Sequence, residues 1–398
     1  MKKVLIIGAG FLQSYVIKKA KELGYYTLAV DGNPNAEGFK YADESAAVNI
    51  IDEKACLEYA RKNKIDGVLT AATDYGVLSA AYVARELSLN GIEYDAARLI
   101  KNKYEFRKRL YEAGADDTEL SYEIKDEQSL AFAKANVKFP IMVKPCDGSG
   151  SRGAARVDDE CDFAEACRFA MSQSLTHRAT AEPFIDGLEY GAESFVCGGE
   201  IHVLAVMKKQ MTRPPYYAEL GHALPSGLSA DMEEKVRACV KKAIKALGIN
   251  FGSVNMDILL TGEGGVHIID IGARMGGNLI GSHIVPLGTG IDYMANMIRA
   301  AVGDDTDFAP KKKAGCVSTR LLALTPGKIA ELPDFEKIKR ETGVIIEHHL
   351  HIGDTINEYH TNLDGCGYVV ASADTYEEAE KLSQRVKEEI DSKIVRRI

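Results

Sequence analysis

Two short apolar stretches decide how this sequence is interpreted: Val-Asn-Met-Asp-Ile-Leu at 254–259 and Val-His-Ile-Ile-Asp-Ile at 266–271. Each has the apolar character of a buried strand and carries one acid, Asp257 in the first and Asp270 in the second. Neighbouring strands would place the two carboxylates side by side on one face, where like charges repel unless a cation balances them. Oxygen ligands of this kind suit Mg²⁺, which enzymes commonly hold with one or two carboxylates and the phosphates of a substrate. The pair therefore predicts a metal site that works on a nucleotide.

Basic and glycine-rich segments accompany this pair. Arg274 follows Asp270 by four residues and precedes two glycines, so a cation and exposed backbone amides would lie near a transferring phosphoryl group. Lys144 ends another apolar stretch and is followed by the glycine-rich segment 147–153. The backbone amides of that segment can wrap phosphate oxygens, although the segment alone is equally typical of a surface hairpin and is not a Walker A loop. The acid pair is what favours phosphate chemistry.

The amino-terminal segment predicts a doubly wound α/β domain. An apolar run, a glycine turn at 8–10, a helical stretch and a second strand at 27–30 follow in that order. The turn and Asp31 resemble part of a dinucleotide fingerprint, but Gln13 stands where the third glycine is required. We interpret the turn as a structural feature beside a substrate pocket, with a nicotinamide-dependent oxidoreductase as the alternative from another class.

Composition and charge exclude several other classes. The 398 residues carry 49 Lys and Arg against 58 Asp and Glu, a net charge of −9, without a basic stretch suited to a nucleic acid backbone. The first apolar run ends after four residues, and no segment reaches the length of about 20 apolar residues that a membrane span needs. The eight cysteines form no C-x-x-C pair, which is typical of reduced thiols. We therefore expect a cytoplasmic protein with no nucleic acid or membrane partner.

Taken together, these motifs resemble the ATP-grasp superfamily over nearly the whole chain. The resemblance implies a mixed α/β and α+β fold, in which a Rossmann-like domain precedes a small nucleotide lid and a larger catalytic lobe. The expected ranges are 1–95 for the Rossmann-like domain, 96–188 for a linker helix and the lid, 189–310 for the catalytic lobe, and 311–398 for an α+β module packed on that lobe. Within the second range, residues 96–113 are expected to form one helix.

The resemblance also assigns roles to individual residues. Nine would bind ATP: two lysines and a loop at the phosphates, a hinge at the adenine and an acid at the ribose. In that order they are Lys103 and Lys144; Ser149, Gly150 and Ser151; Glu182, Phe184 and Ile185; and Glu189. Asp257 and Asp270 match the family's two metal carboxylates, which would hold Mg²⁺, with Mn²⁺ as an alternative. Arg274 matches the arginine beside an acyl-phosphate.

One departure from the family pattern makes the sequence similar to one branch of the superfamily. The second metal segment commonly has Glu and then Asn two residues later, whereas this sequence has Asp270 and Gly272, which implies that water replaces a metal ligand. A small residue at that position is similar to the amino acid ligase branch. Glu219 and His222 fit the Glu-x-x-His element of the same branch. An ordinary loop histidine is the alternative interpretation of His222.

The resemblance thus implies an ATP-dependent carboxylate–amine ligase. ATP would phosphorylate a small amino-acid-like carboxylate, and an amine would then attack the acyl-phosphate to form an amide with release of ADP and phosphate. His222 and Glu219 would orient or deprotonate that amine. The resemblance also points to a homodimer. Three alternatives stay open: a purine enzyme similar to phosphoribosylamine–glycine ligase, the nicotinamide-dependent oxidoreductase, and a nucleotide-binding regulator without turnover.

Overall fold

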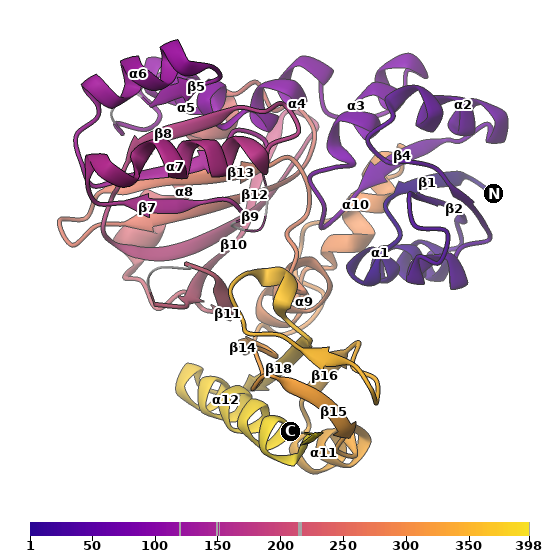
Figure 1. Cartoon of the computed structure of the whole chain (residues 1–398). Coiled ribbons are helices and arrows are strands. Elements are labelled where there is room, and N and C mark those ends of the chain that lie inside the picture. The colour runs from indigo at the N-terminus through magenta and orange to yellow at the C-terminus, as the bar shows by residue number, and fades with distance from the viewer. Residues whose placement is uncertain (119–120, 149, 151, 214–216, 398) are drawn as a thin grey trace.

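A computed structural model describes residues 1–118, 121–148, 150, 152–213 and 217–397, which form four sheets (Figure 1). The first sheet is parallel, with the strand order β3-β2-β1-β4. Its strands are Lys3–Ile7 (β1), Tyr26–Asp31 (β2), Glu44–Ala47 (β3) and Gly67–Thr70 (β4), and its helices are Phe11–Glu22 (α1), Glu53–Asn63 (α2) and Val77–Glu86 (α3). Strand, glycine turn, helix and strand follow each other as the sequence predicts.

The amino-terminal glycine turn is stabilised by Asp31, which resembles part of a dinucleotide fingerprint, and by Gln13, which departs from that fingerprint. Gly8 has a φ of +99°, a conformation that favours glycine. The Asp31 carboxylate accepts hydrogen bonds from the backbone N–H groups of Ala9 and Asn33, each at 2.8 Å. The Gln13 side-chain amide donates to the carbonyl oxygen of Ala71, after β4, at 2.7 Å. Asp31 and Gln13 therefore have structural partners, which agrees with the structural interpretation of the turn.

The linker after this domain consists of two helices, so the expectation of one helix over 96–113 is wrong. Helix α4 spans Tyr94–Lys101 and α5 spans Lys103–Glu112, and Asn102 between them has an extended backbone. Its side-chain oxygen accepts hydrogen bonds from two backbone N–H groups in the first turn of α5, at 3.1 and 3.3 Å. Such a cap satisfies N–H groups that have no helical partner, and it competes with continuation of the preceding helix. The break places Lys103 at the first position of α5.

The lid is an antiparallel sheet with the strand order β5-β8-β6-β7. Its strands are Tyr122–Ile124 (β5), Ile141–Pro145 (β6), Ala155–Val157 (β7) and Ala179–Pro183 (β8), and its helices are Glu127–Asn136 (α6) and Glu160–Ser172 (α7). The two helices contact each other and the sheet, and they bury a core around Leu130 and Phe163. Because β6 and β8 are neighbours, Lys144 and Glu182 lie on adjacent strands.

Eight antiparallel strands form the largest sheet, in the order β13-β12-β9-β10-β11-β14-β18-β16. They are Leu188–Cys197 (β9), Glu200–Met211 (β10), Glu219–Leu224 (β11), Gly252–Leu260 (β12), Val266–Gly272 (β13), Cys316–Leu321 (β14), Ile345–His348 (β16) and Gly367–Ala373 (β18). The sheet passes from the catalytic lobe into the carboxy-terminal module where β11 pairs with β14. The expected boundary at 310–311 therefore lies in a connection between strands of one sheet.

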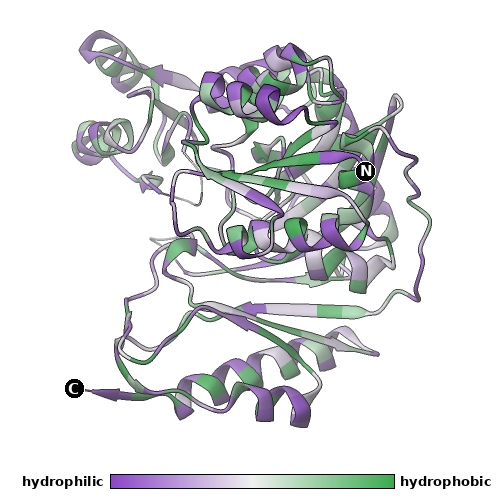
Figure 2. Ribbon diagram, turned by 90° about the vertical axis from the view of Figure 1, so that its right-hand side faces the viewer, coloured by the Kyte–Doolittle hydropathy of each residue, from purple (hydrophilic) through white to green (hydrophobic). Residues whose placement is uncertain are grey.

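Helices cover this sheet and complete the carboxy-terminal module. Ala230–Ala246 (α8) contacts β10 and β13, and Tyr376–Lys393 (α12) contacts β14 and β18. The other elements are Val285–Thr289 (α9), Tyr293–Ala301 (α10), Phe335–Thr342 (α11), Gly327–Glu331 (β15), Thr355–Ile356 (β17), Val395–Arg397 (β19) and the short helices Glu37–Lys40 (η1), Ile280–Ile284 (η2) and Asn362–Asp364 (η3). In Figure 2 the helices alternate between hydrophobic and hydrophilic segments, as expected for helices with one buried face. Within the described ranges, no helix has the length and hydropathy needed to cross a membrane.

Candidate active site

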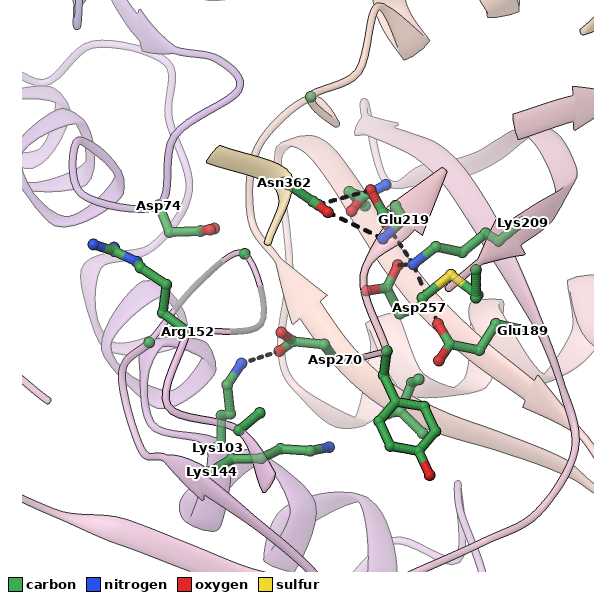
Figure 3. Close-up of a pocket in the computed structure, with 18 of the residues that line it drawn as sticks. Asp74, Lys103, Lys144, Arg152, Glu189, Lys209, Glu219, Asp257, Asp270 and Asn362 are labelled. Carbon is green, nitrogen blue, oxygen red and sulfur yellow. Dashed lines mark hydrogen bonds and ion pairs between the residues drawn. The ribbon is translucent and has the colours of Figure 1, made fainter. Parts of the chain in front are cut away.

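A cavity of about 470 Å³ lies where the parts of the chain meet. Its walls come from the loop after β4, the lid, the strands β9 to β13 and the carboxy-terminal module (Figure 3). Every predicted site residue that the structure describes lines this cavity: Lys103, Lys144, Gly150, Glu182, Phe184, Ile185, Glu189, Glu219, His222, Asp257, Asp270 and Arg274. The other two predicted residues, Ser149 and Ser151, lie outside the described residues.

The two predicted metal carboxylates lie opposite each other on neighbouring strands. Asp257 of β12 and Asp270 of β13 are register partners. Both carboxylates face a cation of the protein: the Lys209 ammonium is 2.9 Å from Asp257, and the Lys103 ammonium forms an ion pair with Asp270 (Figure 3). Burial, which outweighs the effect of Lys209, raises the pKa of Asp257 to about 6. Paired carboxylates that already bind positive charge fit a hard cation such as Mg²⁺.

Gly272 stands where the family pattern has a further metal ligand, and its surroundings explain the difference. A Cβ at this position would lie 2.9 Å from the guanidinium carbon of Arg274 and 3.0 Å from a carboxylate oxygen of Asp74. A side chain at residue 272 would therefore require the Arg274 guanidinium and the Asp74 carboxylate to shift. Glycine leaves room for the ion pair that Asp74 and Arg274 form with each other.

The Arg274 guanidinium is held by two residues, Asp74 and Asn255. Its Nε and Nη2 atoms each donate to a different Asp74 oxygen at 3.0 Å, and Nη1 donates to Asn255 at 3.3 Å. Burial opposes the charge of the guanidinium, but Asp74 raises the pKa of Arg274 above its usual range. Asp74 belongs to the loop after β4, so the amino-terminal domain positions the predicted catalytic arginine.

A fully buried acid supports the segment that follows Arg274. Glu193 of β9 accepts hydrogen bonds from the Tyr293 hydroxyl at 2.6 Å, the Asn255 amide at 3.0 Å and the Gly276 backbone N–H at 3.1 Å. Burial raises the pKa of Glu193 to about 7. These bonds fix Asn255 and Gly276 beside the guanidinium, so Glu193 is a positioning residue.

The predicted adenine hinge contains a buried charged cluster. Glu182 of β8 forms ion pairs with Arg107 of α5 and with Lys144 of β6. Burial opposes its ionisation, but Arg107 and Lys144 hold the pKa of Glu182 below its usual range. The Arg156 guanidinium lies 4.2 Å from the centre of the Phe184 ring. The carboxylate side chain is thus engaged within the protein, and the aromatic ring of Phe184 lines the cavity.

The Glu-x-x-His element lies against the carboxy-terminal module. The Glu219 carboxylate accepts from the Lys209 ammonium at 2.5 Å and from the Asn362 amide at 3.1 Å, and it also contacts the Asn278 amide (Figure 3). Burial opposes its ionisation, but Lys209 lowers the pKa of Glu219 to about 2. His222 is 1% exposed, its Nε2 lies 4.0 Å from Glu219, and burial lowers its pKa to about 4. Near neutral pH the element is therefore a neutral imidazole beside an anion.

Two sequence families match the chain. Residues 137–282 match the ATP-grasp domain, and residues 320–395 match the L-amino acid ligase C-terminal domain 2. The chain contains an ATP-grasp domain. This finding confirms the superfamily that the motifs predict, and all predicted site residues except Lys103 lie within the matched range of the ATP-grasp domain.

Similar proteins agree with the ATP-grasp assignment. Dapdiamide A synthase from Enterobacter agglomerans is 23% identical, and the alignment covers 93% of this chain and 92% of that protein. Carnosine synthase 1 from Mus musculus is 25% identical, over 76% of this chain but 40% of that longer protein. The structure of L-amino acid ligase from Bacillus licheniformis superposes with a TM-score of 0.86 at 23% identity, covering 100% of this chain and 99% of that chain. Phosphoribosylglycinamide synthetase from Anaerococcus prevotii gives a TM-score of 0.78 at 24% identity, covering 100% of both chains. These structures confirm the ATP-grasp fold.

Sequence reasoning missed the residues that hold the predicted side chains of the ATP-grasp site in place. They are Asp74, Arg107, Glu193, Lys209, Asn255, Asn278 and Asn362. A signal was available for Asp74, because ligands of parallel α/β sheets bind beyond the carboxyl ends of the strands and Asp74 follows β4. The others carry no local motif, because their partners come from distant segments.

Proposed function

We propose that this protein is an ATP-dependent carboxylate–amine ligase that joins small amino-acid-like substrates through an acyl-phosphate. One observation carries the proposal: the paired acids Asp257 and Asp270 share a cavity with Arg274 and with the Glu219–His222 element. A protein that only binds nucleotide would need the acids but not the arginine and the histidine element. The match of residues 320–395 to the L-amino acid ligase C-terminal domain 2 favours this function over a purine enzyme that joins glycine to a sugar amine.

The first half-reaction activates the carboxylate, which by itself has no good leaving group. A carboxylate oxygen attacks the γ-phosphorus of ATP, the bond from that phosphorus to the bridging oxygen breaks, and ADP leaves. Lys103 and Lys144 bind the phosphate oxygens as point charges. Arg274 orients the carboxylate with the two of its five N–H donors that Asp74 and Asn255 do not engage. Mg²⁺ bound at Asp257 and Asp270, or Mn²⁺ in its place, supplies positive charge that balances the phosphate oxygens.

The nucleoside part of ATP is held by the lid and the adjoining strand. The backbone of Glu182, Phe184 and Ile185 contacts the adenine, and Glu189 accepts hydrogen bonds from the ribose hydroxyls. The engagement of the Glu182 side chain by Arg107 and Lys144 supports this role, since it fixes the backbone at the end of β8. Gly150 covers the phosphates together with its loop.

The second half-reaction forms the amide. The amine nitrogen attacks the carbonyl carbon of the acyl-phosphate, the bond from carbon to the phosphate oxygen breaks, phosphate leaves, and the nitrogen loses a proton. Glu219 orients the amine as a hydrogen-bond acceptor, since a carboxyl with a pKa of about 2 is a weak base. The neutral His222 imidazole is the better group to receive the proton. Arg274 stabilises the negative charge that develops on the carbonyl oxygen.

Phosphate release from ATP in a matrix of carboxylates and amines tests the proposal. We expect release to require one carboxylate and one amine together, and mass spectrometry to detect an amide in an amount equal to the phosphate. Calorimetry with ATP and with NAD or NADP supplies the comparison with the oxidoreductase alternative. Tight nicotinamide binding, with no phosphate release for any substrate pair, would refute the proposal. A homodimer, a cytoplasmic location, the absence of a nucleic acid partner and the four expected domain ranges stay predictions.

A further inference from the structure

Lys209 places a buried ammonium at the junction of three predicted subsites. Its Nζ atom lies 2.5 Å from Glu219, 2.9 Å from Asp257 and 3.5 Å from Glu189, and the side chain is 2% exposed (Figure 3). In the proposed function these acids serve the amine, the metal and the ribose. Three carboxylates share one ammonium, so the cluster keeps a net negative charge that a further cation can balance.

The strand order explains how Lys209 reaches Asp257. Lys209 belongs to β10 and Asp257 to β12, and β9 lies between them. At the crossing point β9 carries Gly191, which pairs with Asp257 on one side and with Met207 on the other. A Cβ at Gly191 would already lie 4.0 Å from the Cδ atom of Lys209. A longer side chain there would occupy the path of the lysine, so the glycine allows the ammonium to span β9.

Asp270, the other predicted metal carboxylate, faces a cation in the same way, because the Lys103 ammonium forms an ion pair with it. A divalent ion that binds both carboxylates therefore competes with two ammonium groups, each of which contacts one carboxylate oxygen. The two lysines differ in which group each contacts once a metal ion has taken its carboxylate partner. Lys103 is expected to move to the phosphates of ATP, whereas Lys209 retains Glu219, 2.5 Å away, whatever happens at Asp257.

We propose that Lys209 is a positioning residue that occupies Asp257 until nucleotide binds, so that divalent metal and nucleotide bind cooperatively. The inference rests on the proposed function, since it takes Asp257 and Asp270 as the metal carboxylates. Without nucleotide, repulsion between a divalent ion and the nearby ammonium groups weakens metal binding. With nucleotide, the phosphates add negative charge, accept Lys103 and make displacement of Lys209 from Asp257 favourable.

Binding of Mn²⁺ to the full chain tests this inference, with the electron paramagnetic resonance signal of unbound Mn²⁺ as the readout. The titration is made without nucleotide and with a non-hydrolysable ATP analogue, and the Mn²⁺ that the analogue binds in the absence of protein is subtracted. For the wild-type protein we expect the analogue to tighten Mn²⁺ binding by about tenfold or more, a coupling typical of interacting sites. Lys209→Met should tighten Mn²⁺ binding without nucleotide by about tenfold and reduce the gain from the analogue.

Two further variants make the comparison specific. Lys208→Met is the matched control, because Lys208 precedes Lys209 on β10 and lies 5.8 Å from the Tyr376 ring instead of lining the cavity. We expect its Mn²⁺ binding to equal that of the wild type. Adding Asp257→Asn to Lys209→Met should remove the Mn²⁺ binding that the lysine variant gains without nucleotide.

The outcomes separate this inference from the proposed function. Wild-type protein that binds Mn²⁺ as tightly without the analogue as with it overturns the inference, and that measurement requires no variant. A folded Lys209→Met protein, or Lys209→Gln as the second choice, that binds Mn²⁺ like the wild type overturns it as well. Wild-type protein that binds neither the analogue nor Mn²⁺ in its presence refutes the proposed function itself, and the inference with it.

Discussion

Replacing Arg274 with alanine should separate acyl-phosphate chemistry from nucleotide binding. In the proposed mechanism the guanidinium acts on the substrate carboxylate and on the carbonyl oxygen, and Lys103 and Lys144 bind the phosphates. Loss of one such donor costs about 3–4 kcal/mol in the transition state, which slows amide formation by about 10²–10³. Affinity for a non-hydrolysable ATP analogue should stay close to that of the wild type.

The same change also removes the ion pair with Asp74, whose contribution to stability must be controlled. The two side chains are 16% and 17% exposed, and breaking a buried pair costs about 3–5 kcal/mol. Partial exposure reduces this to about 2–3 kcal/mol for Arg274→Ala. Asp74→Asn is the matched control, because it breaks the same pair and keeps the guanidinium. It should lose similar stability and much less rate.

Thermal unfolding, calorimetry with the ATP analogue and phosphate release are measured on both variants in parallel. An Arg274→Ala protein that fails to bind the analogue, or that turns over like the wild type, would remove Arg274 from the catalytic role. Equal rate losses in Arg274→Ala and Asp74→Asn at equal stability would show that the rate depends on the intact ion pair and not on the guanidinium alone.

Three other changes address the metal carboxylates, the histidine and the contact between α5 and β13. Asp270→Asn keeps the side-chain shape and removes a metal-facing charge, so turnover and Mn²⁺ affinity with the ATP analogue should both fall; unchanged affinity by electron paramagnetic resonance would contradict this. His222→Ala should spare acyl-phosphate formation, trapped chemically before amine is added, and slow amide formation. Since the pKa of His222 is about 4, protonation of this imidazole should cause no loss of rate between pH 7 and pH 5. Asp116, buried after α5, accepts a hydrogen bond from the Ile268 N–H at 2.6 Å; although burial opposes its ionisation, hydrogen bonds lower its pKa from 3.8 to about 2. A carboxyl whose pKa is lower in the folded than in the unfolded protein stabilises the fold at pH values above its unfolded pKa. This stabilisation is lost as the pH falls through the folded pKa. In urea unfolding, Asp116→Asn should therefore cost about 2 kcal/mol at pH 7 and clearly less at pH 3.

Parts of the site that depend on neighbouring residues could be predicted from the sequence. Asp257 and Asp270 lie on strands joined by a short connection, so the alternation of side chains along each strand suffices to place both acids on one face. The glycine turn at 8–10 and its strand and helix are likewise local. In the sequence, Gln13 distinguishes this turn from a complete dinucleotide fingerprint, and in the structure its amide donates to the carbonyl oxygen of Ala71.

Contacts between distant segments could not be predicted in the same way. Asp74 and Arg274 are 200 positions apart, and Glu219 and Asn362 are 143 apart, so no local spacing connects them. Lys208 and Lys209 lie on opposite faces of β10 by alternation, but the face that lines the cavity depends on where the other domains pack. The break at Asn102 was missed because helical periodicity continues across it, while its capping side chain starts a new helix.

The distribution of partners divides the proposed site into two halves with different structural requirements. The phosphate and adenine half uses α5 and the lid, where Arg107 and Lys144 both bind Glu182 without help from the carboxy-terminal module. The amine half is different, because Glu219 receives hydrogen bonds from Asn278, after β13, and from Asn362, in η3 of that module. The position of Glu219 thus includes a contact with the carboxy-terminal module, whose strands β14 and β18 extend the large sheet beyond β11. In the proposed function, nucleotide binding uses residues of the ATP-grasp domain and the α5 linker, whereas the amine half also uses Asn362 of the carboxy-terminal module.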